Sequence, residues 1–286
     1  MRWTGRREAA RAVLEGRDCL HPASVHDPLS VRIAEELGFE LGMFAGSTAS
    51  LAILGAPDLI LITLTEFAEQ ALRINRAASR LPLIVDADHG YGNALNVQRT
   101  VEELETAGVA ALSIEDTELP RPFGSTAPRL VSVEEGVGKV RAALAARHDP
   151  ALCVFARTGA MSVTGQADCL ARIAAYNASG ADGIFLTGVT TRAELDAAAE
   201  AARLPLILGT LTDAIADRTY LASRGVRVAL QGHAPSQAAA QAIHATLKAL
   251  REGVRPAELP GLPPKGAMAR WTREAGLDEA ATRFLT

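Results

Sequence analysis

The sequence predicts an α/β protein built as a single (β/α)8 TIM barrel, and three observations support that prediction. Short apolar runs alternate with alanine-rich helical stretches along nearly the whole chain. Apolar strands separated by helices are typical of a parallel sheet that is buried on both faces. Three phrases, AGVAALSIED, SGADGIFLTG and RGVRVALQG, share one form in which a glycine ends a helix shortly before the next strand. The length of 286 residues also suits one barrel.

The expected strands are nine short apolar runs, at residues 20–25, 40–45, 59–63, 82–86, 109–114, 152–156, 183–187, 205–208 and 226–230. The expected helices lie between most of them, at residues 28–37, 65–79, 93–107, 133–146, 166–178, 192–202, 214–222 and 236–251. A barrel needs eight strands, so one run must be something else. We exclude 59–63, because it follows Pro57 and continues into a helical stretch without a turn signal. A doubly wound sheet is the alternative, but the units repeat evenly to the end of the chain.

The two ends of the chain have helical patterns of their own. The stretch MRWTGRREAARAVLEG resembles an amphipathic helix and lacks the apolar core of a secretory signal. No linker or sharp change of composition divides the chain, so residues 1–286 are expected to form one barrel domain. Several prolines follow residue 255, and a helical pattern returns at 267–285. Residues 254–286 are therefore predicted to be a C-terminal helical arm, packed on its own subunit or at an interface.

The composition argues against several classes of partner. The formal net charge is −4 and the lysines and arginines are scattered, so no nucleic-acid partner is expected. No apolar stretch approaches the ~20 residues of a membrane span, so no membrane partner is expected either. Cys19, Cys153 and Cys169 are too few for a disulfide framework and lack metal-ligand spacing. A cytoplasmic protein is the natural expectation.

Polar residues follow six of the expected strands. In a (β/α)8 barrel the C-terminal ends of the strands converge on one mouth, where the chemistry takes place. The residues at these ends are Ser47 and Ser50, Asp88 and His89, Glu115 and Asp116, Arg157 and Thr158, Thr210 and Thr212, and Gln231 and His233. Asp86 stands two residues before Asp88, and side chains at i and i+2 of a strand point the same way.

Acids without cysteine or paired histidine suit a hard cation with oxygen ligands, so Mg²⁺ is expected, with Mn²⁺ as the alternative. Mg²⁺ keeps several waters, so one or two carboxylates are enough to hold it. Asp88 is expected to touch the ion because it lies beyond the strand. Asp86 and Glu115 would then hold metal-bound waters. Arg157 is expected to bind a substrate carboxylate, because its planar fork matches that group in a bidentate way.

Each of these residues also has an ordinary structural interpretation. An Asp-x-Asp sequence at a strand end commonly caps a loop, and Glu115 with its neighbour could do the same. Arg157 could form a structural ion pair, His233 could cap the helix that follows it, and GSTAS could cap a helix over 49–54. A functional site is favoured because all of these groups occur together at strand ends.

Together the motifs resemble the phosphoenolpyruvate mutase/isocitrate lyase superfamily. The resemblance covers roughly residues 18–253 and is carried by DADHGYGN at 86–93, GVAALSIED at 108–116, ART at 156–158, GSTAS at 46–50 and QGH at 231–233. It implies a (β/α)8 barrel whose last helix is exchanged between subunits, in a homodimer or homotetramer. It also implies Mg²⁺ near Asp86, Asp88 and Glu115, with Asp58 a further acid near the site, and α-keto or α-hydroxy acids as substrates.

Within the superfamily the chain looks closest to the oxaloacetate decarboxylase branch. By that resemblance Asp88 is the metal ligand, while Ser50, Arg157 and His233 contact the substrate and Ser47 lies in the same loop as Ser50. Arg157 and His233 are then the expected catalytic residues.

Departures from other branches argue against the lyase activity of isocitrate and methylisocitrate lyases and against the phosphoryl chemistry of the mutase. The segment EDTELPRPFG at 115–124 lacks the cysteine-bearing loop of isocitrate and methylisocitrate lyases, and it lacks the lysine- and asparagine-bearing loop of the mutase. Gly159 stands where a polar residue would be expected in relatives. Leu211 stands where relatives often have a tyrosine.

The resemblance implies a carboxy-lyase that converts oxaloacetate into pyruvate and CO₂ with Mg²⁺, through a metal-stabilised enolate. The partner would be a small 2-oxo dicarboxylate. One alternative is a lyase or hydrolase that acts on another 2-oxo diacid, a substituted malate or a methylisocitrate-like acid. Another is a barrel without enzymatic activity, which only binds dicarboxylates or serves as an assembly scaffold.

Overall fold

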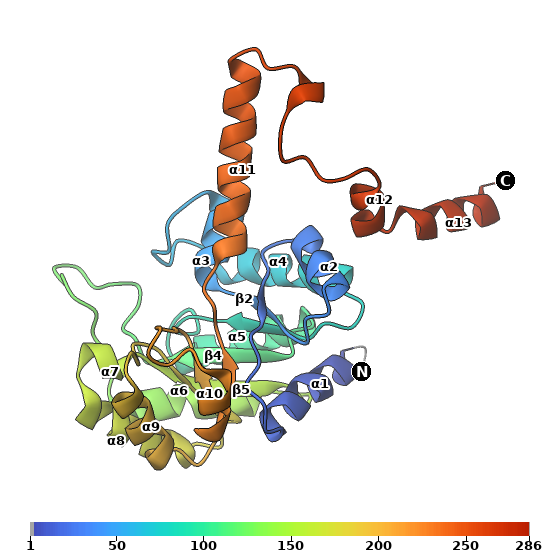
Figure 1. The fold of residues 1–286 in the computed structure, drawn as a ribbon. Helices are drawn as coiled ribbons and strands as arrows, with labels where there is room; N and C mark the ends of the chain where they lie inside the picture. Colours follow the sequence, from blue (N-terminus) through green and yellow to red (C-terminus); the bar gives the residue numbers. More distant parts are fainter. Residues whose placement is uncertain (1–2, 286) are drawn as a thin grey trace.

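The computed structural model describes residues 3–285, and its centre is an eight-stranded parallel barrel in which each strand pairs with the next along the chain (Figure 1). The strands are β1 (Ala23–Ser24), β2 (Gly42–Phe44), β3 (Leu83–Asp86), β4 (Ala111–Glu115), β5 (Cys153–Thr158), β6 (Gly183–Leu186), β7 (Leu206–Leu208) and β8 (Val226–Ala229). Leu20 closes the barrel, because its N–H donates to the Arg227 carbonyl at 2.8 Å and its carbonyl accepts from Ala229 N–H at 2.9 Å. The predicted barrel is therefore confirmed.

Helices follow the strands and cover the outside of the barrel. They are α2 (Pro28–Glu36), α4 (Leu64–Ala77), α5 (Ala94–Thr106), α6 (Val133–Ala146), α8 (Gln166–Asn177), α9 (Arg192–Ala201) and α10 (Arg218–Ser223). Most begin at a side chain that accepts a hydrogen bond from the first turn, as the sequence's Asp, Ser, Thr and Asn residues favour there. These caps are Asp27, Thr63, Asn93, Ser132, Thr191 and Asp217.

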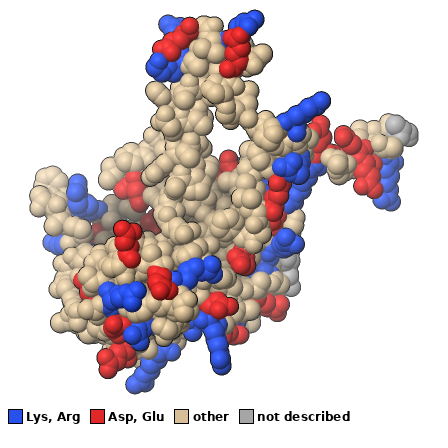
Figure 2. All heavy atoms as spheres, in the orientation of Figure 1, with Lys and Arg blue, Asp and Glu red and all other residues tan. Residues whose placement is uncertain are grey.

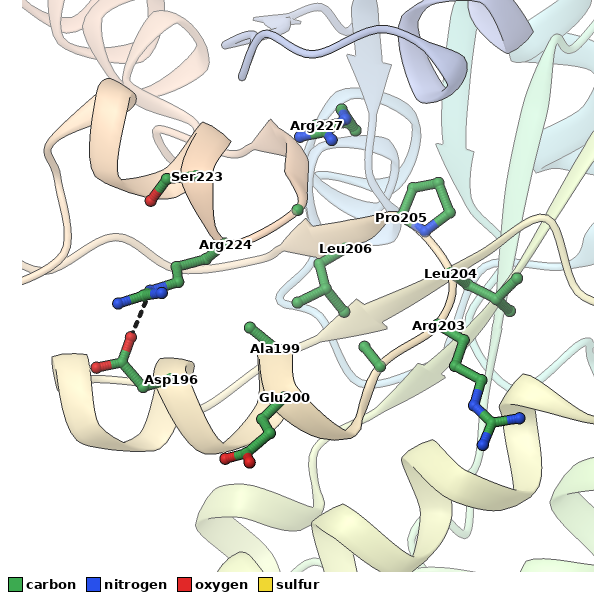
Figure 3. Close-up of a pocket in the computed structure, with 12 residues that line it drawn as sticks. Asp196, Ala199, Glu200, Arg203, Leu204, Pro205, Leu206, Ser223, Arg224 and Arg227 are labelled. Carbon is green, nitrogen blue, oxygen red and sulfur yellow. Dashed lines mark ion pairs between the residues drawn. The ribbon is translucent and has the colours of Figure 1, made fainter.

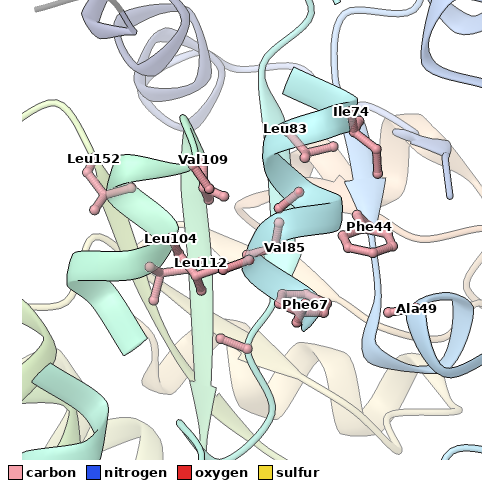
Figure 4. Packing of buried hydrophobic residues seen from close by; sticks show 14 of the residues in the cluster. Phe44, Ala49, Phe67, Ile74, Leu83, Val85, Leu104, Val109, Leu112 and Leu152 are labelled. Carbon is pink, nitrogen blue, oxygen red and sulfur yellow. The ribbon is translucent and has the colours of Figure 1, made fainter. Parts of the chain in front are cut away.

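Alternation along each strand divides the core into two layers. In β3, Leu83 and Val85 point outward into a cluster beneath the helices, where Phe44 and Phe67 stack with their ring centroids 4.8 Å apart (Figure 4). Ile84 points the other way and lies in the cluster that fills the barrel interior. The same alternation carries Asp86, the next residue on the inner side, to the mouth of the barrel.

Helix α1 (Thr4–Glu15) packs across the N-terminal end of the barrel, which confirms the helix predicted there. Its Arg7 is buried and donates to the carbonyls of Val109 and Glu105 and to Asp149 Oδ2, at 3.0, 2.6 and 2.8 Å. The open end, where the chemistry is expected, is therefore the opposite one.

The C-terminal part stands away from the barrel. Helix α11 (Ala234–Arg251) projects outward from the end of β8, and a chain with the short η2 (Pro256–Glu258) returns to α12 (Ala267–Thr272) and α13 (Glu274–Phe284) (Figure 1). Helix α12 lies against α2, where Arg270 pairs with Glu36.

Several predicted boundaries are wrong. The run 59–63 forms no strand, as expected, but only two residues of 20–25 are strand. The helix predicted over 214–222 begins at Arg218, because Asp217 caps it. The helix predicted over 267–285 breaks at Arg273, whose backbone is left-handed with φ 58°. The segment predicted as a helix over 49–54 consists of α3 (Gly46–Ala49) and a π-helical turn, η1 (Ser50–Leu54). A short helix, α7 (Ala160–Val163), was not predicted.

Candidate active site

The inner faces of three adjacent strands bring charged side chains to the mouth of the barrel. Asp86 ends β3, Glu115 ends β4, and Arg157 is the penultimate residue of β5, directly beside Glu115 in the strand pairing. All three occupy inward positions, because they lie an even number of residues from the interior side chains Ile84, Ala111 and Phe155.

Arg157 lies between the two acids and binds both. Its Nη1 pairs with Asp86 Oδ2, and its Nη2 lies 3.3 Å from Glu115 Oε2. The Phe185 ring of β6 lies beneath the guanidinium, 5.3 Å from Arg157 Cζ to the ring centroid. Burial alone would lower the pKa of Arg157, but the carboxylates around it raise that pKa overall. The guanidinium is therefore permanently charged, and its Nε has no partner among residues 3–285.

Asp88 is held rigidly just beyond β3. Its N–H donates to Asp86 Oδ1 at 3.1 Å, its carbonyl accepts from Glu115 N–H at 2.8 Å, and its φ is 48°. A non-glycine residue in this left-handed conformation is strained and often marks a functional position. The residue is 5% exposed, and its Oδ2 is buried without a hydrogen-bond partner in the described part of the chain.

Burial, followed by the nearby charges of Asp86 and Glu115, raises the pKa of Asp88 well above its usual value. Burial is also the main cause that raises the pKa of Glu115, and Arg157 opposes it. The mouth thus concentrates negative charge that Arg157 balances only in part. A positive ligand would relieve both the unpaired carboxylate oxygen and this excess of negative charge.

Asp116 has a structural role, and its side chain does not point into the mouth of the barrel. Because it follows Glu115 directly, its side chain points to the other face of the strand, where it accepts from Arg172 Nη1 at 3.0 Å and Tyr176 Oη at 2.8 Å. Both partners lie on α8. The interpretation of the Glu115–Asp116 pair as loop-capping residues is therefore wrong for Asp116, which joins β4 to a helix.

The two serines of GSTAS differ in their surroundings. Ser50 is fully buried, and its Oγ has no hydrogen-bond partner among the described residues. Ser47 is half-buried, one position after Gly46, which lies against the Asp88 carboxylate. A buried hydroxyl without a partner is costly unless a ligand satisfies it, so Ser50 is the stronger candidate for a substrate contact.

Two further residues near Asp86 are His233, just beyond β8, and Asp58, in the segment between η1 and α4. The His233 ring does not cap α11, because its Nδ1 lies 2.9 Å from Ser24 Oγ at the end of β1. Partial burial lowers the pKa of His233, although Asp86 and Asp58 act in the opposite direction. Burial, and then the charge of Asp86, raise the pKa of Asp58. These mutual effects show that both residues lie within electrostatic reach of Asp86.

The donor set fits a hard divalent cation. All the ligands on offer are carboxylate oxygens, and Asp88 Oδ2 is buried and unpaired. Within residues 3–285, no three His, Cys, Asp or Glu side chains converge closely enough to hold a metal by themselves. Mg²⁺ needs few protein ligands because it keeps its waters.

Other features of the molecule do not compete with this site. A cavity of about 730 Å³ lies at the opposite end of the barrel, between α9 and the starts of β7 and β8. Its arginines do not converge, and Arg224 is paired with Asp196 at 2.6 Å (Figure 3). Basic and acidic side chains intermingle on the face seen in Figure 2. No helix within residues 3–285 is long and apolar enough to cross a membrane.

Sequence reasoning missed three supporting residues. Ser24 contacts His233, Ser113 Oγ donates to Asp86 Oδ1 at 3.3 Å, and Phe185 lies beneath Arg157. Ser113 could have been found, because it is a polar residue two positions before Glu115 in an otherwise apolar strand. Ser24 and Phe185 could not, because their importance depends on which strands are neighbours.

Comparison with known proteins agrees with this geometry. A model of the phosphoenolpyruvate phosphomutase family matches residues 11–251. A protein named oxaloacetate decarboxylase from Rhodopseudomonas palustris (strain BisA53) is 57% identical over 285 residues, which cover 100% of this chain and 98% of the relative. Another of that name, from Bradyrhizobium sp. (strain BTAi1), is 58% identical over 275 residues, covering 96% of this chain and 95% of the relative.

Solved structures of the same fold have related chemistry. Phosphonopyruvate hydrolase in complex with oxalate and Mg²⁺ is 27% identical with a TM-score of 0.85, covering 98% of this chain and 99% of that one. Oxaloacetate acetylhydrolase in complex with the inhibitor 3,3-difluorooxalacetate is 30% identical with a TM-score of 0.84, covering 97% and 95%. The family match over most of the chain, together with these relatives, shows that the chain belongs to the phosphoenolpyruvate phosphomutase family, within the phosphoenolpyruvate mutase/isocitrate lyase superfamily that its motifs predicted.

Proposed function

We propose that the chain is a Mg²⁺-dependent oxaloacetate decarboxylase, which converts oxaloacetate into pyruvate and CO₂. The observation that supports this most directly is the buried, unpaired Oδ2 of Asp88, two residues beyond the Asp86 carboxylate that pairs with Arg157, at the mouth of a barrel whose relatives carry that name. A cation and a cationic side chain at one mouth suit a small, doubly negative 2-oxo acid.

Asp88 would hold the cation directly, and Asp86 and Glu115 would hold its waters. Bound there, a divalent cation supplies Lewis-acid polarisation of a ketone oxygen. Arg157 would anchor the C1 carboxylate of oxaloacetate, with its plane supported by Phe185. Ser50 Oγ, which has no partner among the described residues, would form a hydrogen bond with the substrate.

His233 would face the departing end of oxaloacetate and hold the enolate oxygen or the leaving carboxylate. In the reaction the C3–C4 bond breaks, its electron pair passes toward C2, and the C2 oxygen gains negative charge as CO₂ leaves. Backbone N–H groups near Ser47 would share that charge. A proton from solvent at C3 then completes pyruvate, so the chain needs no general base for this step.

Asp88→Asn tests the proposal with little change of shape. We expect metal-dependent pyruvate formation from oxaloacetate to fall by more than about 100-fold, because an amide replaces the charged ligand. The matched control is Asp213→Asn, an exposed acid after β7, which should retain activity. A reaction without protein at the same Mg²⁺ concentration sets the baseline, and EDTA should abolish the enzymatic part. Unchanged turnover of Asp88→Asn would contradict the metal assignment.

The alternative activity, on another 2-oxo diacid or a substituted malate, has support from neighbours such as 2,3-dimethylmalate lyase, which is 30% identical with a TM-score of 0.81. A panel of such acids, with product analysis, separates it from decarboxylation. The same panel with Mn²⁺ in place of Mg²⁺ tests the metal preference.

We also propose that the enzyme is a cytoplasmic homodimer or homotetramer in which α11 is exchanged between subunits. All three cysteines are buried and unbridged, as suits a reducing compartment. Helix α11 buries only Ser236 of its own residues, although it carries several large apolar side chains.

A further inference from the structure

The hydrogen bond between Ser24 and His233 has a role that neither the motifs nor the comparisons assign. Ser24 ends β1, and His233 lies just beyond β8, 209 positions later. Closure of the barrel makes these strands neighbours and brings Ser24 Oγ to within 2.9 Å of His233 Nδ1. A contact between two strand ends at the mouth is a means of fixing the His233 ring.

The chemistry of the two groups indicates which one donates. A serine hydroxyl carries one hydrogen, and a neutral imidazole has one N–H and one accepting nitrogen. The bond to His233 is the only one that the structure gives the Ser24 hydroxyl within the described chain. If Nδ1 carried the proton, the hydroxyl hydrogen would have no acceptor among these residues and would need a water, since Ser24 is only half-buried. If the hydroxyl donates to Nδ1, both groups are satisfied.

The ring's other nitrogen then has a defined character. With Nδ1 accepting from Ser24, the proton of the neutral ring lies on Nε2, the nitrogen that Ser24 leaves free for a ligand. Partial burial also lowers the pKa of His233, which favours the neutral ring near pH 7. An Nε2–H group donates a hydrogen bond and cannot accept a proton at that atom.

We propose that Ser24 is a positioning residue that holds His233 as the Nε2–H tautomer, so that His233 donates a hydrogen bond to a substrate oxygen and does not act as a base. This inference rests on the proposed function for the identity of the substrate, but the tautomer itself does not. A donor fits the decarboxylation proposed above, which creates negative charge on oxygen and requires no base.

The tautomer is measured directly by solid-state ¹⁵N NMR of the full-length enzyme labelled with ¹⁵N-histidine. The signals that disappear in His233→Gln belong to His233. We expect an unprotonated Nδ1 and a protonated Nε2 in the wild type, and a mixed or reversed pattern in Ser24→Ala. Ser24→Thr, which keeps the hydroxyl, should restore the wild-type pattern. A protonated Nδ1 in the wild type, or an unchanged pattern in Ser24→Ala, overturns the inference.

Kinetics provide the second readout. Ser24→Ala should lower kcat for oxaloacetate about tenfold, with a smaller change in KM, because the lost orientation matters most as charge develops on the substrate. Ser24→Thr should recover most of the activity. Ser162→Ala is the matched control and should remain active, because the Ser162 hydroxyl, in α7 after β5, donates only to the Gly159 carbonyl among residues 3–285.

The two proposals fail in different ways. If the wild type shows the expected tautomer but does not decarboxylate oxaloacetate, the function is wrong and the positioning of His233 stands. If the wild type is active while Ser24→Ala changes neither the ¹⁵N pattern nor kcat, the function stands and the role of Ser24 is wrong.

Discussion

At the scale of single residues, the site is organised around a carboxylate that cannot move far. The Asp88 backbone is fixed by hydrogen bonds to Asp86 and Glu115, and its side chain lies against the backbone of Gly46. A side chain held in this way is preorganised for a ligand, because little ordering remains to be done on binding. The Asp88 carboxylate can take this position because Gly46 has no side chain.

Gly46→Ala tests this preorganisation. A Cβ at Gly46 would lie 2.9 Å from both Asp88 Oδ1 and Oδ2, which is too close, so the carboxylate must turn. We expect the affinity for Mg²⁺ to fall about tenfold, as is typical when a neighbour that orients a ligand is disturbed. Isothermal titration calorimetry with Mg²⁺ measures this directly.

Gly138→Ala is the control for that substitution. It makes the same change on α6, where a Cβ meets nothing within 4 Å. Its metal affinity should match the wild type. Equal affinity in Gly46→Ala would show that the Asp88 carboxylate has freedom that the structure does not indicate.

The sequence predicts which site residues point into the barrel wherever strand alternation alone sets the direction of the side chain. Asp86 and Glu115 point inward because they end buried strands in a known phase, and Arg157 follows the same rule. The sequence left two roles open for Arg157, a contact to a substrate carboxylate or a structural ion pair, and the structure pairs its guanidinium with Asp86 and Glu115, which the sequence did not name as its partners. Pairs across strands depend on register, which a single strand does not reveal.

At the scale of elements, one buried glutamate connects three segments. Glu35 of α2 accepts three backbone N–H groups on Oε1, from Ser79, Arg80 and Leu81 at 2.8, 2.6 and 2.8 Å. Its Oε2 accepts from Arg273 at 2.7 Å. One carboxylate thus joins α2 to the turn before β3 and to the C-terminal arm.

Glu35→Gln should destabilise the protein in a pH-dependent way. Burial raises the pKa of Glu35, but the hydrogen bonds outweigh it and the pKa in the folded state is lowered. A lowered pKa contributes stability above the unfolded value of about 4.3, and that stability is lost as the pH falls toward the folded value. We expect the free energy of unfolding to fall by about 2 kcal/mol at pH 7. The difference should shrink below about pH 4.

Urea unfolding of both proteins at several pH values measures this effect. Glu36→Gln is the matched control, since the neighbouring glutamate is exposed and pairs only with Arg270 in the structure described. A difference that stayed constant down to pH 3 would show that packing, and not the charge of Glu35, accounts for the loss.

Elements were easier to predict than their ends. The repeat of apolar run and helix revealed all eight strands, because burial on both faces leaves a clear pattern. Pro57 and the missing turn signal excluded the run 59–63. The break at Arg273 left no such signal, since the residues around it favour a helix. It occurs where Arg273 Nη1 donates to the Ala77 carbonyl at 3.1 Å and Nη2 reaches Glu35, and such tertiary contacts override local propensity.

At the scale of the whole molecule, the barrel leaves apolar surface uncovered on α2 and α11. Leu247 on α11 is 62% exposed and Leu37 after α2 is 69% exposed. A groove of about 470 Å³ runs between α2 and the base of α11, lined by Ile33, Phe39 and Pro235 among others. In Figure 2, the projecting helix α11 shows charged side chains only near its far end. Such surfaces are characteristic of contact between subunits.

Leu247→Glu tests whether a second copy covers α11. Ile243, Leu247 and Leu250 lie on one face of the helix, and burying each in a partner would contribute about 1.5–3 kcal/mol. The wild type should elute at a multiple of the 30.0 kDa chain mass in size-exclusion chromatography with light scattering. Leu247→Glu should shift it toward the monomer, because the interface would have to bury a charge.

Gln241→Glu introduces the same charge on the opposite face of α11, and it is the control for the position of the interface. If α11 lies with its apolar face against another subunit, Gln241→Glu keeps the wild-type mass while Leu247→Glu does not. If both variants stay assembled, the helix contributes little to the oligomer. A wild type that elutes as a monomer would contradict the exchange of α11, and the uncovered face of α2 would then need another partner.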